Sequence, residues 1–387
     1  MASAAIPLFP EIRDVVAPRK DTLGLPEAAV KRLTKAGVDL SQGYPYRPAA
    51  PLYLDDVYKI RSEPWDHVEP GARADKSKKA LFSAASKVTD FTAYVGTQVD
   101  GLQLKDLTAQ QKDELGLLIA ERGVVVFPNQ DLSPQEQLKL GEWYGKIEIH
   151  PQAPIVPGLP GVTVLWPDLQ ATERSVTYRN PGGAAAWHTD LVHEPQPAGV
   201  THLHNDVVPT VGGDTLFASG YAAYEKLSPA FREIIDGRYA VYRSGHAYLD
   251  RDNPTAGPKY VERVHPLVRV HPATGWKALW VNRQMTLRIV GLDPGESDAI
   301  LNYLYHVYET NVDIQARIKW TAGTSVLWDN RIMIHNASWD YAGREPRHGT
   351  RVTSLGEKPY FDPDAPTRRQ ALGQLGPDEL EEDGLVA

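Results

Sequence analysis

The second half of this chain most strongly constrains its fold, because short apolar or alternating runs there are separated by Pro, Gly and Asn. Strands are predicted over residues 162–166, 200–204, 239–243, 278–282, 315–320, 325–329 and 351–355. Helices are predicted after Ser228 and Asp293, where a proline follows a capping residue. Many short strands joined by such turns indicate a β-sandwich or barrel, with a few helices packed outside it.

The segment from residue 90 to 145 has clearer helix signals. Thr108 with Gln111 fits a capping box, and Gly123 is suited to end the helix that follows. Residues 124–127 are then predicted as a buried strand, and Ser133 as the cap of a second helix that runs to about Tyr144.

Composition limits the kinds of partner and cofactor. The 387 residues allow one large domain with extensions, and 49 acidic against 41 basic residues without a basic block argue against nucleic acid. We find no leader pattern and no apolar stretch approaching about 20 residues, so we expect a cytoplasmic protein without a membrane partner. The chain has no cysteine, which excludes disulfides and thiolate metal sites. Any metal must therefore be held by His, Asp or Glu.

A candidate metal site begins with His188 and Asp190, whose side chains leave the same face of an extended backbone. His335, which lies 147 positions later, is a candidate second histidine. Two His and one carboxylate form the facial triad of non-haem iron oxygenases, although a zinc hydrolase uses the same ligand types. Three nearby histidines are expected to be structural: His193, His202 and His204.

Two arginines favour iron over zinc. Arg347 follows His335 by twelve positions and precedes Arg351 by four. A guanidinium can bind a carboxylate or sulfonate through two hydrogen bonds, and a dicarboxylate co-substrate needs such an anchor away from the metal.

Six stretches together resemble the taurine/sulfonate dioxygenase family of iron- and 2-oxoglutarate-dependent oxygenases, in its fungal branch. They are EIHP near residue 150, WHTD (187–190), GGDTLFASGYAAYEKLS (212–228), HPATG…LWVN (271–282), WDNR…H (328–335) and TRVTSLGEKP (350–359). The resemblance spans roughly residues 90–360. It implies a double-stranded β-helix, that is a distorted, cupin-like jelly roll. We expect an N-terminal extension (1–85), a dioxygenase domain (86–362) and a C-terminal tail (363–387).

The resemblance also implies roles for individual residues. His188, Asp190 and His335 match the catalytic iron ligands. Thr215 and Arg347 match the residues that hold the distal carboxylate of 2-oxoglutarate, and His150 and Arg351 match the two sulfonate contacts.

Four further positions depart from the taurine enzyme's pattern. Ala153 and Ala184 replace an expected tyrosine and asparagine, so the amine end of taurine would lose partners. Met285 takes an aromatic wall position, and Tyr242 is a candidate for the replacement of another ring. The anion contacts are therefore expected to be kept in a remodelled substrate pocket.

Three functions are open at this point. The first is a dioxygenase that uses Fe(II), 2-oxoglutarate and O2 to hydroxylate a small anionic substrate, an alkyl sulfonate, with release of aldehyde, sulfite, succinate and CO2. The second is a related oxygenase that acts on an amino acid or a biosynthetic carboxylate. The third is a non-catalytic metal-binding sensor. A homo-oligomer is left open.

Overall fold

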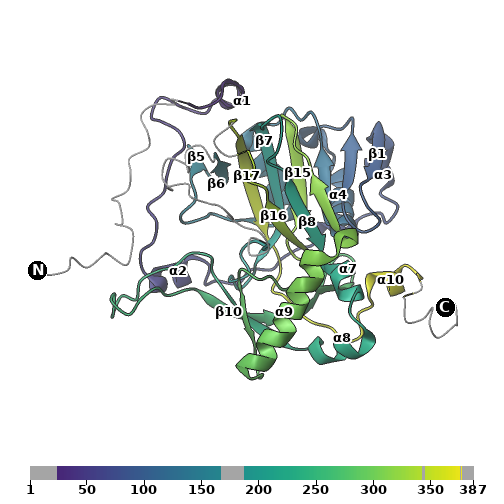
Figure 1. Ribbon diagram of the computed structural model, residues 1–387. Helices are drawn as coiled ribbons and strands as arrows, with labels where there is room; N and C mark the ends of the chain where they lie inside the picture. Colours follow the sequence, from purple (N-terminus) through teal and green to yellow (C-terminus); the bar gives the residue numbers. More distant parts are fainter. Residues whose placement is uncertain (1–23, 167–186, 342–344, 375, 377–387) are drawn as a thin grey trace, which may run out of the picture.

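A nine-stranded sheet is the largest element of the computed structural model, which describes residues 24–166, 187–341, 345–374 and 376 (Figure 1). In spatial order its strands are β1 (Lys87–Asp90), β2 (Thr97–Asp100), β3 (Val124–Phe127), β15 (Thr324–Asp329), β7 (Ala198–Val207), β17 (His348–Leu355), β6 (Leu159–Leu165) and β5 (Ile155–Val156), and β4 (Lys146–Ile147) pairs with β17. Only β2 and β3 run parallel among these pairs. Every strand predicted from the sequence overlaps a strand of the structure.

A second sheet faces the first and encloses the core between them. It consists of β14 (Gln315–Ile318), β8 (Thr215–Ser219) and β16 (Met333–Ala337). Phe217 of this sheet packs on Trp328 of the main sheet, with ring centroids 5.6 Å apart, and Leu203 and Val326 belong to the same buried cluster. Two facing sheets of antiparallel strands around one apolar core form the jelly roll that we expected.

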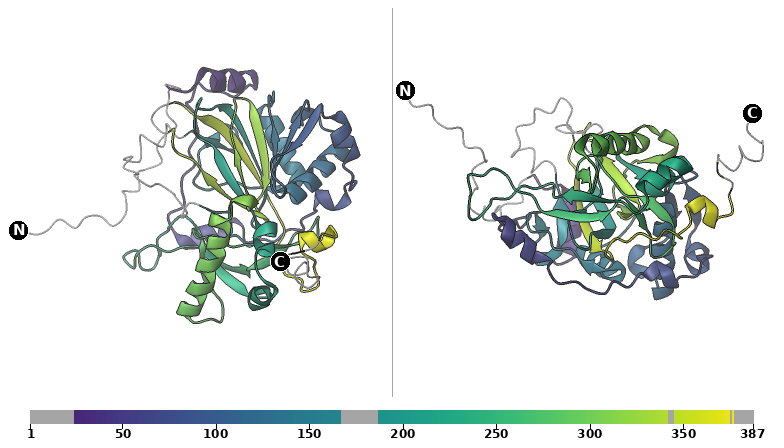
Figure 2. Two further views of the ribbon diagram at one scale, coloured as in Figure 1. Left: turned by 45° about the vertical axis from the view of Figure 1, so that its right-hand side comes forward. Right: turned by 90° about the horizontal axis from the view of Figure 1, so that it is seen from below.

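Two smaller sheets extend this core. One contains β10 (Glu262–Pro266), β9 (Tyr239–Arg243) and β13 (Thr286–Ile289), and the other contains β11 (Val268–Val270) and β12 (Lys277–Leu279). They pack with α7 (Gly220–Glu225), α8 (Pro229–Ile235) and α9 (Pro294–Thr310) around a second buried cluster. Helix α9 lies near the end of the main sheet opposite to α1 (Glu27–Lys35) in Figure 1 and in the left view of Figure 2.

The two helices on either side of β3 begin and end where the sequence predicts. Helix α4 (Ala109–Arg122) has the capping box of Thr108 and Gln111 and ends at Gly123, whose φ of 75° suits glycine. Helix α5 (Pro134–Tyr144) begins after the capping box of Ser133 and Glu136. The remaining short elements are α3 (Lys79–Ala84), α10 (Arg368–Ala371), and the 3-10 helices Pro70–Arg73, Leu104–Asp106 and Val312–Ile314. Within the described ranges, every helix is too short or too polar to cross a bilayer.

Residues 24–85 lie against the jelly roll over much of their length. Arg32 of α1 contacts Asp206 and Thr350 on the outer face of the main sheet, and Tyr44 contacts His348 there. Helix α2 (Leu54–Ile60) packs instead on residues 248–261 at the other end. This segment thus reaches both ends of the domain.

The turn between β15 and β16 is held by a buried network of charges. Arg331 donates to Asp329 at 2.8 and 2.6 Å, contacts Glu357 at 3.2 Å, and also pairs with Glu69 from the N-terminal segment. His271 lies 2.9 Å from the Asp329 carboxylate. Burial raises the pKa of Asp329, but the charges and hydrogen bonds of Arg331 and His271 together outweigh it, so the pKa lies below its usual value. The carboxylates around Arg331 therefore stay ionised inside the protein.

We expect Arg331→Gln to lower the free energy of unfolding by about 3–5 kcal/mol, because it leaves buried carboxylates without a compensating charge. Arg73→Gln is the matched control, since Arg73 pairs with Asp113 at 2.7 Å but its side chain is 47% exposed. That variant should lose less than about 1 kcal/mol. Urea unfolding measures both, and equal small losses would contradict a structural role for the network.

Candidate active site

Two backbone hydrogen bonds bring His188 and His335 together. The His188 amide donates to the His335 carbonyl at 3.0 Å, and the His335 amide donates to the His188 carbonyl at 2.7 Å. His335 lies on β16, whereas His188 lies in the segment that leads into β7. The pairing therefore fixes the two histidines from distant parts of the chain beside each other.

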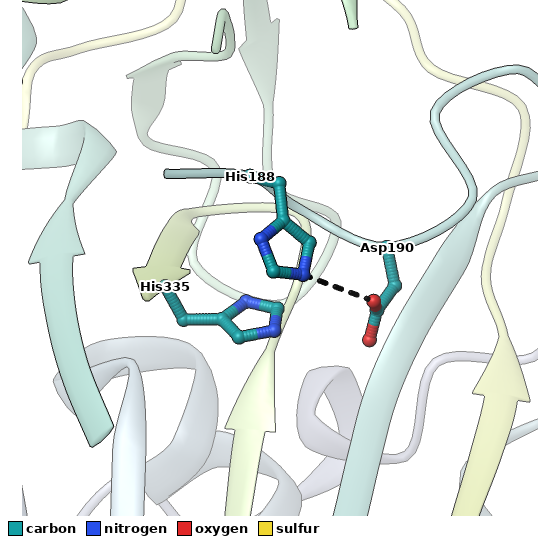
Figure 3. A group of neighbouring side chains, drawn as sticks. All are labelled: His188, Asp190 and His335. Atoms are coloured by element: carbon teal, nitrogen blue, oxygen red, sulfur yellow. Dashed lines mark ion pairs between the residues drawn. The ribbon is translucent and has the colours of Figure 1, made fainter. Parts of the chain in front are cut away.

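The side chains of His188, Asp190 and His335 converge (Figure 3). One ligand atom from each lies within 4.8 Å of the other two, and His188 Nε2 lies 3.8 Å from Asp190 Oδ1. Protein nitrogen and carboxylate ligands sit about 2.0–2.2 Å from a divalent metal, so a single ion can contact this pair of atoms. The predicted triad is thus assembled.

Asn330 fixes the segment that carries two of these residues. Its backbone carbonyl accepts the Thr189 hydroxyl at 2.7 Å, and its side-chain oxygen accepts the Asp190 amide at 3.3 Å. Its side-chain amide donates to Gly199 and Thr201 on β7. Asn330 therefore locks the ligand segment to the main sheet, a positioning role that we did not predict.

The electrostatics of the triad suit a cation. Burial raises the pKa of Asp190, but the charges of Arg351, His335 and His188 outweigh it and hold the pKa below its usual value. Burial, together with His188, lowers the pKa of His335 to about 3, which keeps this imidazole neutral. Asp190 Oδ2 and His335 Nδ1 are buried, and neither has a hydrogen-bond partner among the residues that the structure describes. An ionised carboxylate and neutral imidazoles are the protonation states that bind metals.

A second group of possible ligands, His67, Glu69 and Glu357, also lies within 4.8 Å. Arg331 pairs with both carboxylates of this group. A guanidinium already supplies the positive charge there, so we assign this group to the structural network.

Thr215 lies on β8 of the second sheet, and Arg347 directly precedes β17 of the main sheet. Thr215 pairs with Ala337 in the register that places Phe217 opposite His335. The Trp320 indole donates to the Thr215 hydroxyl at 3.0 Å, and the same ring lies 5.6 Å from the Arg347 guanidinium. Arg347 is buried and donates to the Gly213 carbonyl at 2.9 Å. Thr215 and Arg347 thus contact the same Trp320 ring, as two residues that bind one anion are expected to do.

A cavity of about 330 Å³ opens beside the triad. Among the predicted substrate residues, His150, Met285 and Arg351 line it, together with His188 and Asp190. Tyr242 is not placed with them: it is fully buried in the second core, and its hydroxyl donates to the Trp280 carbonyl at 2.6 Å. Ala153 lies beside His150, and Ala184 falls outside the described residues.

The hydrogen bonds of His150 define its tautomer. Its Nδ1 accepts from the amides of Gln152 and Ala153 at 3.1 and 3.0 Å. Burial and the charge of Arg351 lower the pKa of His150 to about 3, so the ring is neutral. The single ring proton therefore sits on Nε2, which makes this atom a hydrogen-bond donor.

Seven further residues line the cavity: Glu148, Leu191, His193, Gly245, His246, Gln284 and Thr353. None of them is among the predicted substrate residues, and His193, predicted to be structural, lies at the cavity wall. Glu148 lies in the EIHP stretch used for the resemblance, but nothing in the sequence indicates that its carboxylate is buried. Burial raises the pKa of Glu148 to about 7, against the opposing charges of Arg61 and Arg351. His193 contacts Glu194 at 3.5 Å, and His246 packs against the His150 ring.

Comparison with known proteins is consistent with this geometry. The family model "Taurine catabolism dioxygenase TauD, TfdA family" matches residues 87–353. An alpha-ketoglutarate-dependent sulfonate dioxygenase of Saccharomyces cerevisiae is 34% identical over 77% of this chain and 74% of its own length. An alpha-ketoglutarate-dependent dioxygenase of Penicillium expansum, cnsP, is 35% identical over 82% of this chain and 88% of its own.

Solved structures agree with the sequence matches. A taurine dioxygenase from Burkholderia xenovorans superimposes with a TM-score of 0.61 at 30% identity, over 72% of this chain and 92% of that one. The fold and site thus define an alpha-ketoglutarate-dependent dioxygenase, which confirms the predicted class of enzyme. The chain belongs to the TauD, TfdA family.

We expect Asp190→Ala to bind divalent metal at least about 100-fold more weakly, because even residues that only orient a ligand are worth 10–100-fold in metal affinity. Titration of the metal-free protein with Mn(II) measures this affinity, and 2-oxoglutarate turnover should be lost as well. Asp131→Ala is the control, since Asp131 is exposed and its ion pairs within the described ranges are with Lys35 and Lys105. Metal affinity in the Asp190 variant equal to that of the control would refute the site.

Proposed function

We propose that this enzyme oxidises a small organic sulfonate, with 2-oxoglutarate and O2 as co-substrates, at one Fe(II) held by His188, Asp190 and His335. The observation that carries the proposal is the placement of two anion-binding groups beside the triad. Arg351 Nη1 lies 3.6 Å from Asp190 Oδ2, and the buried Nε of Arg351 has no hydrogen-bond partner in the described part of the chain. The Nε2 proton of His150 is a second donor in the same cavity.

The name of the yeast relative supports a sulfonate as the substrate class. A sulfonate carries one delocalised negative charge on oxygen atoms, which a guanidinium and a neutral imidazole N–H can bind together. Because the pKa of His150 is lowered, the ring donates a hydrogen bond without adding a second positive charge. The site therefore favours a monoanionic head group over a dianion.

In this proposal the remaining residues divide between positioning and exclusion of water. Arg347 and Thr215 hold the distal carboxylate of 2-oxoglutarate, so that its other end can reach the triad. Arg351 and His150 fix the head group of the substrate, which presents the carbon next to sulfur to the metal side of the cavity. Met285 supplies an apolar wall. Bound Fe(II) would supply the chemistry that couples decarboxylation of 2-oxoglutarate to hydroxylation of that carbon.

In this reaction 2-oxoglutarate is converted to succinate and CO2. One oxygen atom of O2 enters succinate, and the other is transferred to the substrate carbon. The hydroxylated carbon then breaks its bond to sulfur and leaves as an aldehyde, while the head group leaves as sulfite. The residues 1–85, 86–362 and 363–387 form the extension, the catalytic domain and the tail in this proposal.

We expect ethanesulfonate, butanesulfonate or taurine to stimulate 2-oxoglutarate turnover with release of one sulfite for each succinate. Taurine should be the poorest of the three, because Ala153 offers no polar partner to its amine. Succinate and sulfite are measured in parallel in the iron-loaded enzyme.

The matched alternatives are the carboxylates of the same chain lengths and free amino acids. Succinate formation with these compounds, and none with the sulfonates, would replace the sulfonate with a carboxylate substrate. Bound iron without stimulation by any anion would favour a metal-binding sensor.

Arg347→Gln should raise the apparent KM for 2-oxoglutarate by about tenfold or more, since it removes a charge-assisted hydrogen bond. Arg351→Gln should instead raise the apparent KM for the sulfonate by a similar factor. Each variant is the control for the other in steady-state assays that vary one co-substrate at a time. If both variants change both constants equally, the two arginines do not have separate ligands.

A further inference from the structure

A residue outside the range of the family model lies beside the substrate cavity. Arg61 directly follows helix α2, and its side chain is only 8% exposed. Its Nη2 donates to Glu194 at 2.6 Å, and its Nη1 lies 3.6 Å from Glu148 Oε1. The family model begins at residue 87, so this contact belongs to the N-terminal segment of this chain.

Helix α2 positions Arg61 through several contacts with residues 248–261 of the catalytic domain. The Leu54 amide donates to the Leu249 carbonyl at 3.0 Å, and the Leu249 amide donates to Leu52 at 2.9 Å. Val57 packs in a small buried cluster with Tyr248 and Val261. Gly245 and His246, which line the cavity, lie just before residue 248. The position of Arg61 is therefore fixed relative to the cavity wall.

Buried charges of opposite sign alternate from the cavity to this helix. Glu148 donates its backbone amide to Thr353 at 2.9 Å, which places it two residues along β17 from Arg351. Both side chains line the cavity. Within the described residues, Glu148 Oε1 is buried and accepts no hydrogen bond, and Arg351 Nε is buried and donates none. Glu148 thus interacts with the charges of both Arg61 and Arg351.

We propose that Arg61 is a positioning residue that holds the Glu148 carboxylate away from Arg351 and so keeps Arg351 available for the anionic group of the substrate. This inference rests on the proposed function, in which Arg351 binds that group. Arg61, whose Nη1 lies 3.6 Å from Glu148 Oε1, offsets part of the charge of Glu148. Without Arg61, Arg351 is the cation in the described part of the chain whose charge still favours the ionised Glu148, and pairing of the two would compete with the substrate.

Arg61→Gln should raise the apparent KM for the best of the three sulfonates by about tenfold or more and change the KM for 2-oxoglutarate less than about twofold. Arg73→Gln is the control, because Arg73 also belongs to the N-terminal segment but pairs with Asp113 on the surface. It should leave both constants unchanged. An unchanged sulfonate KM in the Arg61 variant would overturn the inference.

A rescue experiment separates competition from simple undocking of α2. The double variant Arg61→Gln/Glu148→Gln should recover most of the lost sulfonate affinity, because no carboxylate remains to pair with Arg351. Undocking would not be reversed by the second substitution, so an equal or larger KM in the double variant counts against the inference. If Arg61→Gln does not fold, Arg61→Lys, which keeps the charge without the two-pronged geometry, should raise the KM by a smaller factor.

A crystal structure of Arg61→Gln tests the inference without a substrate. The Glu148 carboxylate should move to within about 3.2 Å of the Arg351 guanidinium, the range of a hydrogen bond. If the two groups stay apart, the inference fails even where the wild-type enzyme oxidises sulfonates. If the wild-type enzyme oxidises none of them, the proposed function fails, and the measured separation still decides how Arg61 acts on Arg351.

Discussion

The backbone pairing of His188 with His335 is the constraint on which the active site depends. Two hydrogen bonds between these residues join segments 147 positions apart, and they place two imidazoles and the nearby Asp190 carboxylate around one point. A metal cannot create this arrangement from an extended chain without a large cost in conformational entropy. This loss of conformational entropy is instead incurred when the jelly roll folds, because β16 and the segment before β7 are held by two sheets that share one core.

The turn between β15 and β16 links this pairing to the rest of the domain. Asn330 binds Thr189 and Asp190 on one side and β7 on the other, while its neighbours Asp329 and Arg331 belong to the buried charge network. The consecutive residues 329–331 thus hold both the candidate metal ligands and the N-terminal segment in place. Such a network adds little net stability over apolar packing, but it disfavours alternative arrangements because each misplaced charge would be buried without a partner.

Much of the fold and of the candidate site could be predicted from the sequence, and the residues that could not be predicted share a physical cause. Helix caps, buried strands and the triad depend on local spacing or on stretches shared with a family, so Thr108, Ser133 and His188 were assigned in advance. Tyr242 was expected at the cavity but lies in the core, because alternation along a strand does not show which of two apolar clusters a face will meet. Glu148 and Arg61 were missed since their burial arises from packing between distant segments. No local pattern encodes such a contact.

The substrate end of the site shows how a protein can keep a partly buried cation, Arg351, available for a ligand. A lone buried arginine is costly, and a carboxylate placed against it would stabilise the protein but would also occupy the anion site. Here Glu148 makes no close hydrogen bond to Arg351 within the described residues. Arg61 compensates part of the negative charge of Glu148, and Glu194 compensates part of the positive charge of Arg61. Each charge in this series is partly balanced by the next. The carboxylate of Glu148 therefore stabilises the charge of Arg351 without a direct hydrogen bond, and the N–H groups of Arg351 stay available to a ligand. An N-terminal segment that reaches the cavity is therefore a means of tuning substrate binding without changing the metal site.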